Sequence, residues 1–358
     1  MSGYEYGNAR LRAMKSRLLS EADYRVLARS ESLDDLIGAL TRTAYRRAVE
    51  AALVRVGEPE AISYALSQDL IVTARRIRTF YEPPAQHMLA IILRSYDVHN
   101  LKTILRGVEH GAAPDEIRAL LLPIGDLTEA VLDDLVQMPS LRAAIDRIAT
   151  LRLPQAAALT AARAGRTDAI LTDIELALER WYFETAMQQA QTGRGEAASL
   201  REALAVDADL TNLLTVLRLV HAPGERAALQ RRIEPGGWRT LFVGPGRLSF
   251  TLLESVVEEP ALAGVADALG QSVYAAPLRA GVEAARRSGR LSDVERRLKR
   301  WRLHWRAGLI ARDPLGTGVP LGYLALKVNE IGNLRWIARG VRARLAADAI
   351  LAEVEWVA

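Results

Sequence analysis

The residues best suited to chemistry are scattered through this 358-residue chain rather than gathered into a motif. Histidine is a frequent metal ligand and a general base near neutral pH. The five histidines, however, show no metal-ligand spacing such as His-x-x-x-His. The chain also has no cysteine, which excludes disulfides, thiolate metal sites and cysteine nucleophiles. We therefore expect no catalytic residue, no bound metal and no cofactor. The histidines are His87, His99, His110, His221 and His304.

Two aspartate pairs and two glycine-rich segments come nearest to known catalytic patterns. Asp34-Asp35 and Asp133-Asp134 suggest fragments of the motif that holds magnesium in helical prenyl-transferring enzymes, but no further acid follows at the required position. Solvated helix faces explain these pairs better. The segments 244–246 and 316–318 do not complete a phosphate-binding loop, and Gly-Lys-Ser/Thr is absent. We expect no nucleotide site and no small-molecule substrate.

The composition limits the fold class and the partners. Half of the residues are apolar, which is enough for two or three domains with real cores. Ala, Leu, Arg and Glu dominate and runs of β-branched residues are scarce, so we expect an all-α protein. No stretch stays apolar and uncharged for the roughly 18 residues of a membrane span. A soluble, cytoplasmic protein is expected. A net charge of +4 suits an anionic partner surface but does not by itself indicate nucleic-acid binding.

One pattern of acid, asparagine and arginine occurs three times, and it organises the whole chain. In each copy an acid is followed by Asn at the third position, Leu at the fourth, apolar residues at the seventh and eighth, and Arg at the ninth. We call these nine residues the signature residues. They are Asp97, Asn100 and Arg106; Asp209, Asn212 and Arg218; and Glu330, Asn333 and Arg339.

Each signature predicts a helix with one buried stripe, because residues about 100° apart place the apolar positions on one face. The stripes are Leu101, Ile104, Leu105 and Val108; Leu213, Val216, Leu217 and Val220; and Leu334, Ile337, Ala338 and Val341. The acid lies within the stripe and needs hydrogen-bond donors there, which the free N–H groups at a neighbouring helix start could supply.

The signature arginines point away from the stripe, and two interpretations stay open. A cation near the C-terminal end of a helix meets free carbonyls, and Gly107 and Gly340 would then be the glycines that end the helix. Alternatively, the arginines contact another domain or a partner.

Other landmarks repeat in step with the signature. A first helix is expected over about 8–19, and Ser32 should cap a second at 33–40. The second helix has counterparts after Ser140 and Pro260, and a longer helix carrying Ile62 is matched at Ile174 and Val294. Because these spacings of roughly 110 to 120 residues equal a whole domain, we predict three similar helical domains at 1–113, 114–233 and 234–358. Three like bodies favour a pseudo-threefold arrangement.

The segment 296–306 is the richest candidate for a partner surface, with basic residues and no acid. Val294, Leu298, Trp301, Trp305 and Leu309 form one apolar stripe at helical spacing. The basic side chains fill the rest of the helix, either as a solvated face or as a surface that rests on acidic loops or lipid headgroups. The candidate contact residues are Arg296, Arg297, Arg300 and Arg302. Arg75-Arg76-Ile77-Arg78 is a lesser basic cluster of the same kind.

The signature stretches resemble a known family. Segment 96–107 (Tyr-Asp-Val-His-Asn-Leu-Lys-Thr-Ile-Leu-Arg-Gly), the opening Tyr6-x-x-Ala9-Arg10-Leu11-Arg12-Ala13-Met14-Lys15 and the closing stretch 330–340 are similar to the C subunit of the central stalk in archaeal and bacterial V/A-type ATPases. Its counterpart in vacuolar enzymes is called d. The resemblance covers essentially the whole length, with Glu330 where an Asp is usual and Leu219 where a Gly is usual.

The resemblance implies an all-helical funnel of three like domains on the cytoplasmic side of the membrane. There it would seat the shaft subunits D and F on the proteolipid ring and couple their rotation to ion transport, such as proton transport, without catalysis. No nucleic acid and no substrate would be bound. The composition leaves one alternative open, a helical adaptor for an acidic protein or nucleic-acid surface. An enzyme at the pseudo-threefold centre would need convergent ligands that the repeat does not supply.

Overall fold

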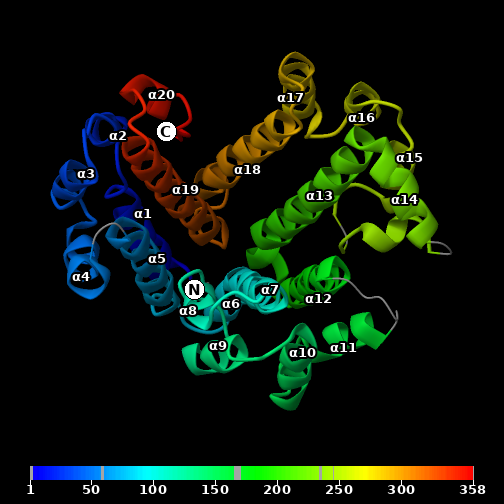
Figure 1. Cartoon of the computed structure of the whole chain (residues 1–358), viewed down its shortest axis with the longest axis horizontal. Coiled ribbons are helices and arrows are strands. Elements are labelled where there is room, and N and C mark those ends of the chain that lie inside the picture. Colours follow the sequence, from blue (N-terminus) through cyan, green and yellow to red (C-terminus); the bar gives the residue numbers. More distant parts are fainter. Residues whose placement is uncertain (1–2, 58–59, 165–170, 234–235, 245, 358) are drawn as a thin grey trace. The chain divides into compact units, whose positions relative to one another are not determined.

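The computed structural model describes residues 3–57, 60–164, 171–233, 236–244 and 246–357. Across these ranges the chain forms α-helices and two short 3-10 helices with no strand, which confirms the all-α prediction (Figure 1). The helices are α1 (Glu5–Lys15), α2 (Glu21–Ala28), α3 (Leu33–Leu40), α4 (Arg46–Val56), α5 (Ala61–Arg78), α6 (Ala85–Leu93), α7 (Ser95–Glu109), α8 (Pro114–Arg118), α9 (Glu129–Val136), α10 (Leu141–Thr150), α11 (Ala156–Ala164), α12 (Leu171–Thr192), η1 (Arg194–Ala197), α13 (Ala198–His221), α14 (Pro223–Ile233), η2 (Trp238–Leu241), α15 (Phe250–Val257), α16 (Leu262–Ala268), α17 (Ala275–Ser288), α18 (Ser292–Arg312), α19 (Gly318–Arg342) and α20 (Ala347–Leu351).

The predicted starts of the second helices are largely confirmed. The Ser32 hydroxyl accepts a hydrogen bond from the Asp35 N–H at the start of α3, and Ser140 does the same for Ala143 in α10. The third counterpart, α16, follows Ala261 and has no side-chain cap. The first helix lies earlier than the sequence predicts, because α1 begins at Glu5 and ends at Lys15.

Three further capped helices have no counterpart among the sequence predictions. α2, α9 and α15 begin after Ser20, Thr128 and Ser249, and each hydroxyl accepts an N–H three residues further on. Such a side chain satisfies one of the N–H groups that a helix start leaves without a partner.

The chain divides into two compact units. The first contains residues 1–139, 195–199 and 306–358, and the second contains residues 140–194 and 200–305. Each unit therefore gathers segments that are distant in sequence, and each is described by itself below.

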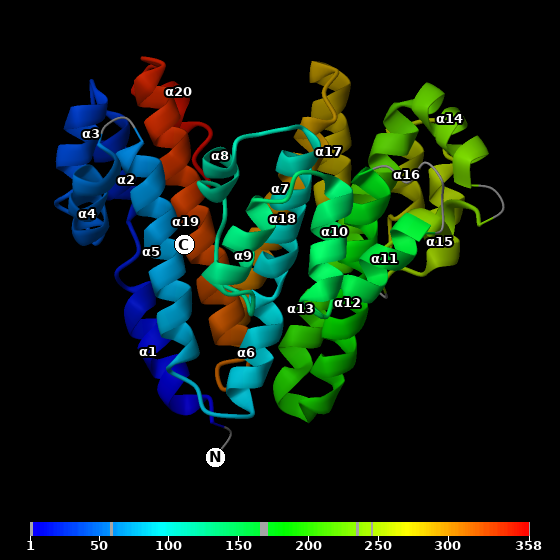
Figure 2. The same cartoon turned by 60° about the horizontal axis from the view of Figure 1, so that its bottom comes forward.

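In the first unit, α19 is the helix that others surround. It packs against α1, α2, α3, α5 and α20, and α1, α5 and α19 can be followed side by side in Figures 1 and 2. Its predicted stripe is confirmed, because Leu334, Ile337 and Val341 are buried and Ala338 is half-buried. Burying a Leu or Ile side chain fully stabilises the fold by about 1.5–3 kcal/mol. The stripe of α7 is buried as well, with Val108 half-buried at its end.

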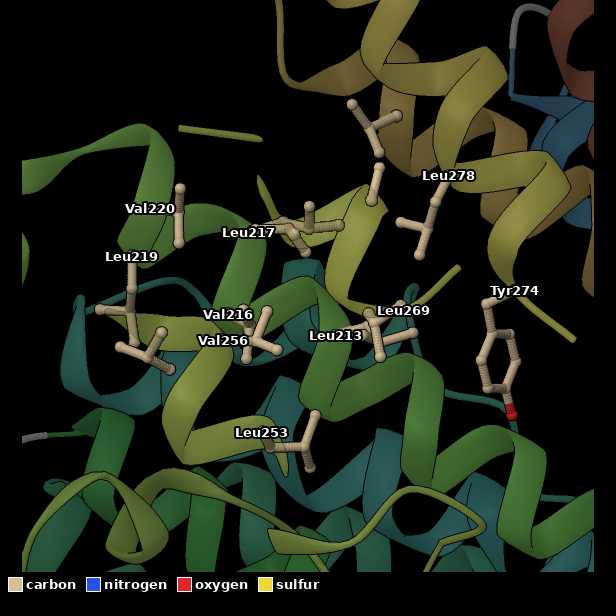
Figure 3. Close-up of a cluster of buried hydrophobic side chains, with 14 of the residues drawn as sticks. Leu213, Val216, Leu217, Leu219, Val220, Leu253, Val256, Leu269, Tyr274 and Leu278 are labelled. Atoms are coloured by element: carbon tan, nitrogen blue, oxygen red, sulfur yellow. The ribbon is translucent and has the colours of Figure 1, made fainter. Parts of the chain in front are cut away.

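The second unit has its own hydrophobic core, drawn in Figure 3. Leu213, Val216 and Leu217 of α13 lie opposite Leu253 and Val256 of α15, and Leu278 of α17 closes the cluster from another side. All are almost fully buried. The stripe predicted for the second signature is therefore the wall of a core that three helices share.

The ends of α7 and α19 correct one prediction. Gly107 and Gly340 lie inside these helices, each two residues before the last helical residue. The residues with left-handed backbone are Gly111 (φ 67°) and Arg344 (φ 54°). In both cases the next N–H returns to the carbonyl of Gly107 or Gly340 at 2.9 Å, the bond that closes a Schellman motif.

The two internal glycines have a packing role instead. A Cβ on Gly107 would lie 2.5 Å from Cγ1 of Ile117, and a Cβ on Gly340 would lie 2.6 Å from Cγ1 of Ile350. Both isoleucines are buried and come from the short helices α8 and α20. Glycine is needed because a side chain would push the short helix off the signature helix.

Candidate functional site

The three signature asparagines all do the same thing: each binds both backbone groups of one loop residue. The amide nitrogen donates to the carbonyl of that residue, and the amide oxygen accepts its N–H. The pairs are Asn100 with Leu122 (2.8 and 2.8 Å), Asn212 with Val243 (3.3 and 2.8 Å) and Asn333 with Glu355 (3.0 and 3.0 Å).

Asparagine suits this position for a chemical reason. Its side chain carries a donor and an acceptor side by side, as a peptide group does. All three asparagines are at most 5% exposed, so the loop groups they bind would otherwise lose their bonds to water. The signature asparagine is thus a clamp on a downstream loop.

The first signature acid binds the start of a neighbouring helix. Asp97 accepts hydrogen bonds from the N–H groups of Asp126 and Leu127 at 2.8 and 3.0 Å. These two residues stand just before Thr128, the N-cap of α9. The predicted source of donors is therefore close to correct, although the N–H groups precede the helix rather than belong to it.

Burial of Asp97 raises the pKa of its carboxyl above the ordinary value, and the two N–H donors oppose that shift. Asp97 is 1% exposed. Its position reflects the packing of the loop rather than access to a substrate.

The second signature acid repeats the arrangement in the other unit. Asp209 accepts from the N–H groups of Arg247 and Leu248, both at 3.0 Å, just before the N-cap Ser249. The Tyr274 hydroxyl donates a third bond at 2.7 Å. In Figure 3 this hydroxyl points out of the apolar cluster. Burial also raises the pKa of Asp209, against the pull of these donors.

Two glycines let the loops come close enough to the aspartates. A Cβ on Gly125 would overlap the Asp97 carboxylate, and a Cβ on Gly246 would overlap that of Asp209. Gly246 belongs to the glycine-rich segment 244–246, whose middle residue lies outside the described residues. Its glycine thus serves a backbone contact. In the other such segment, 316–318, the Gly316 carbonyl accepts from the Asn8 side chain at 3.1 Å.

The third signature acid joins the two ends of the chain within the first unit. Glu330 accepts from the Leu19 N–H at 2.5 Å and from the Tyr45 hydroxyl at 2.6 Å. Leu19 precedes Ser20, the N-cap of α2, just as Leu127 precedes Thr128. The last signature helix therefore binds the start of the first capped helix, a contact that spans 311 residues.

A buried lysine completes this third contact. Lys327 lies 3.0 Å from Glu330 and 2.7 Å from Asp69, and it is 6% exposed. The Tyr45 hydroxyl accepts a bond from Lys327 at 2.8 Å. Burial and the neighbouring Glu330 raise the pKa of Tyr45 well above its ordinary value, so Tyr45 stays protonated and donates to the carboxylate.

The signature arginines are exposed on the opposite side of their helices, as the spacing predicts. Arg218 pairs with Glu295 of α18 at 2.9 Å within the second unit. Arg339 borders a cavity described below. The two interpretations of Arg106, Arg218 and Arg339, helix capping and contact with another domain or a partner, stay predictions.

The basic segment lies on α18 as expected. Val294, Leu298 and Leu309 are buried, and Trp301 and Trp305 are half-buried, which confirms the stripe. Arg296, Arg297 and Arg300 are exposed. Arg302 is half-buried and pairs with Asp207 at 3.6 Å, so it differs from the other three candidates.

The lesser basic cluster binds inside the first unit. Arg75 donates to the Pro123 carbonyl at 3.1 Å and pairs with Glu129 at 2.6 Å, and Arg78 donates to the Gly125 carbonyl at 2.9 Å. Both arginines thus hold the loop that Asp97 binds. This cluster serves the fold.

The chemistry of these contacts is structural. Each signature acid is occupied by backbone or tyrosine donors, and each asparagine by a loop. Within the described ranges, no three His, Cys, Asp or Glu side chains are grouped so that they could hold a metal ion. Among those residues no helix is long and apolar enough to cross a membrane.

Comparison with known proteins identifies the family. The family model of the ATP synthase (C/AC39) subunit matches residues 7–353. The chain belongs to the ATP synthase (C/AC39) subunit family. It is 26% identical to the C subunit of the A-type ATP synthase of Haloquadratum walsbyi over 98% of both chains.

Two further relatives of this family extend the comparison. The C subunit of the A-type ATP synthase of Methanocaldococcus jannaschii is 24% identical over 98% of this chain and 86% of its own length. The C subunit of the V-type ATP synthase of Deinococcus radiodurans is 27% identical over 98% and 91%. The resemblance that the signature stretches suggested is confirmed, and the chain is related to C subunits of both A-type and V-type ATP synthases.

Sequence reasoning missed several residues that bind the signature acids and asparagines of this C/AC39 chain. Two of them, Tyr45 and Tyr274, are far in sequence from the acids that they bind. Lys327 is near Glu330 but lies outside the signature pattern, and so do the loop residues. One signal was available: Tyr45 and Tyr274 stand in matching positions, 26 residues after Leu19 and Leu248. It becomes visible only when the copies are aligned on the capped helices.

The asparagine clamp predicts that two substitutions near the Glu355 carbonyl lower the free energy of unfolding by different amounts. Asn333→Ala removes both bonds to Glu355 and should lower the free energy of unfolding by about 2 kcal/mol, since a buried donor and acceptor lose their partners. Asn329→Ala removes only a second donor to the same carbonyl and should cost less than about half as much. Urea unfolding of the two variants makes the comparison. Equal losses would contradict the clamp.

The space around Gly125 and around Gly332 predicts opposite effects of alanine on stability at these two positions. Gly125→Ala places a methyl group on the Asp97 carboxylate and should lower the melting temperature by several degrees. Gly332→Ala meets open space on helix α19 and should raise stability by up to about 1 kcal/mol. Calorimetry of both variants tests this. A neutral Gly125→Ala would show that the loop need not touch Asp97.

Proposed function

We propose that the chain is a non-catalytic central-stalk subunit of a rotary V/A-type ATPase or ATP synthase. In this role it seats the central shaft, made of subunits D and F, on the proteolipid ring of the membrane sector. It transmits torque between them and so links ATP chemistry elsewhere to ion transport. Its place is at the membrane periphery, on the cytoplasmic side.

The observation that supports this proposal most is that the recurring polar residues bind loops of the chain itself. The family match spans nearly the whole chain, and the polar positions that recur in it bind loops rather than a substrate. A torque-bearing part needs helices that do not slide on their connections. Paired buried hydrogen bonds and close-packed interiors resist such deformation.

We further propose that the chain is one helical domain in three copies, at 1–113, 114–233 and 234–358, in a pseudo-threefold, funnel-like arrangement. The recurrence of the capped helix, the acid and the clamp in each third supports a common ancestor.

Assembly tests the proposed role directly. Co-expression with the proteolipid ring protein and with D and F should yield complexes in which this chain binds both the ring and the shaft. Recovery of nucleic acid instead, with steep salt dependence, would favour the adaptor alternative. A hydrolytic or transfer activity of the isolated chain, abolished by a single substitution, would contradict a non-catalytic role.

The basic face of α18 is the surface that we propose for a partner. Arg296, Arg297 and Arg300 are exposed on one helix, and anionic loops or headgroups would be attracted to them. Changing all three to Glu reverses three positive charges and should weaken ring association at least about tenfold while the melting temperature changes little. Pull-down with the ring at two salt concentrations measures this.

A matched control is available in the same unit. Arg286, Arg287 and Arg290 are also exposed, and their change to Glu alters the net charge equally. If this control weakens ring association as much as the α18 variant, the effect comes from net charge alone and the proposed surface is wrong.

A further inference from the structure

A cavity of about 450 Å³ in the first unit is lined by cations and hydroxyl groups. It lies among α3, α5, α7, the segment 119–122 and α19. Its size falls within the range of small-molecule sites. None of its residues belongs to the acid or asparagine contacts described above, apart from Leu122 at the clamped loop.

Three arginines reach the cavity from one helix. Arg335, Arg339 and Arg342 are spaced by four and three residues on α19, so they share a face over two turns. Ser63 and Ser67 border the same cavity from α5. The arrangement brings permanent positive charge and hydroxyl groups to one small volume.

The charge of the cavity is not balanced by its walls. No Asp or Glu is among the described residues that line it. Arg335 is half-buried, its Nη2 donates to Ser67 Oγ at 2.8 Å, and its buried Nε has no hydrogen-bond partner among the described residues.

The neighbouring groups show the same excess of positive charge. Burial and the nearby Arg339 lower the pKa of Arg335. The pKa of His99, which also lines the cavity, is lowered as well, first by burial and then by Lys102, Arg106 and Arg335. An anion in the cavity would relieve this repulsion.

The set of donors fits phosphate better than carboxylate. Three guanidinium groups offer more N–H donors than the two oxygens of one carboxylate can accept, whereas a phosphate group presents three or four oxygens and up to two charges. Leu33, Ile62 and Ala338 add apolar wall next to the cations, which suits the organic part of a phosphate ester.

We propose that this cavity binds the phosphate group of an organic phosphate or lipid headgroup through Arg335, Arg339 and Arg342. The sequence contains no phosphate-binding motif, because the arginines and the serines come from separate helices. The site is independent of the proposed stalk role, since it needs only the isolated full chain.

The test compares two double variants of the full chain. Arg339→Gln/Arg342→Gln removes two exposed cations from the cavity, and Arg286→Gln/Arg287→Gln removes two exposed cations elsewhere. Titration calorimetry and thermal unfolding are run with pyrophosphate and with ADP, against sodium chloride at equal ionic strength and against citrate. Sedimentation with phosphatidylglycerol vesicles, compared with phosphatidylcholine vesicles, examines the headgroup source.

We expect pyrophosphate or ADP to raise the melting temperature by a few degrees and to bind at least about tenfold more weakly to the cavity variant than to the control variant. Binding to phosphatidylglycerol vesicles alone, lost in the cavity variant only, would also support the proposal and assign the phosphate to a headgroup. Equal binding of citrate, equal losses in the two variants, or no binding of any probe would overturn it.

Discussion

The fold of this chain depends on the cost of burying a peptide group without a partner. Where a loop passes against a signature helix, its N–H and carbonyl groups leave water and must bond to the protein. Asn100, Asn212 and Asn333 meet that demand with one amide each, and the acid three residues earlier binds the backbone before a capped helix. The polar residues on the apolar stripe are therefore what fixes the loops, and the apolar stripe is what makes their bonds strong.

The same contact is built with different residues in its three occurrences. Asp97 relies on two backbone donors, Asp209 adds Tyr274, and Glu330 uses Leu19, Tyr45 and Lys327. The longer glutamate side chain and the extra lysine occur where the donor comes from the opposite end of the chain. A buried carboxylate with a single backbone donor needs further partners. Lys327 supplies a positive charge beside Glu330 and also pairs with Asp69. The three contacts thus share a bonded carboxylate rather than the same residue types.

Membership of the ATP synthase (C/AC39) subunit family agrees with this use of polar residues. A catalytic site directs its polar groups at a space that a substrate can enter. Here the repeated polar groups point at the chain itself. The cationic cavity beside α19 is the exception, since Arg335, Arg339 and Arg342 line it and no Asp or Glu is among the described residues of its wall. The two kinds of site share one helix, which has one face turned to the loops and another to the cavity.

The sequence alone determined the helical class, the three buried stripes, the recurring signature and the family, because each is carried by residues close together in the chain. It also placed the caps at Ser32 and Ser140. Tertiary structure decided the rest. Gly107 and Gly340 have the local pattern of helix ends, yet they make room for Ile117 and Ile350, which a local pattern does not reveal. Leu19 and Tyr45, which bind Glu330, and the helices that line the cavity lie up to about 300 residues apart in the sequence, and only packing brings these groups together.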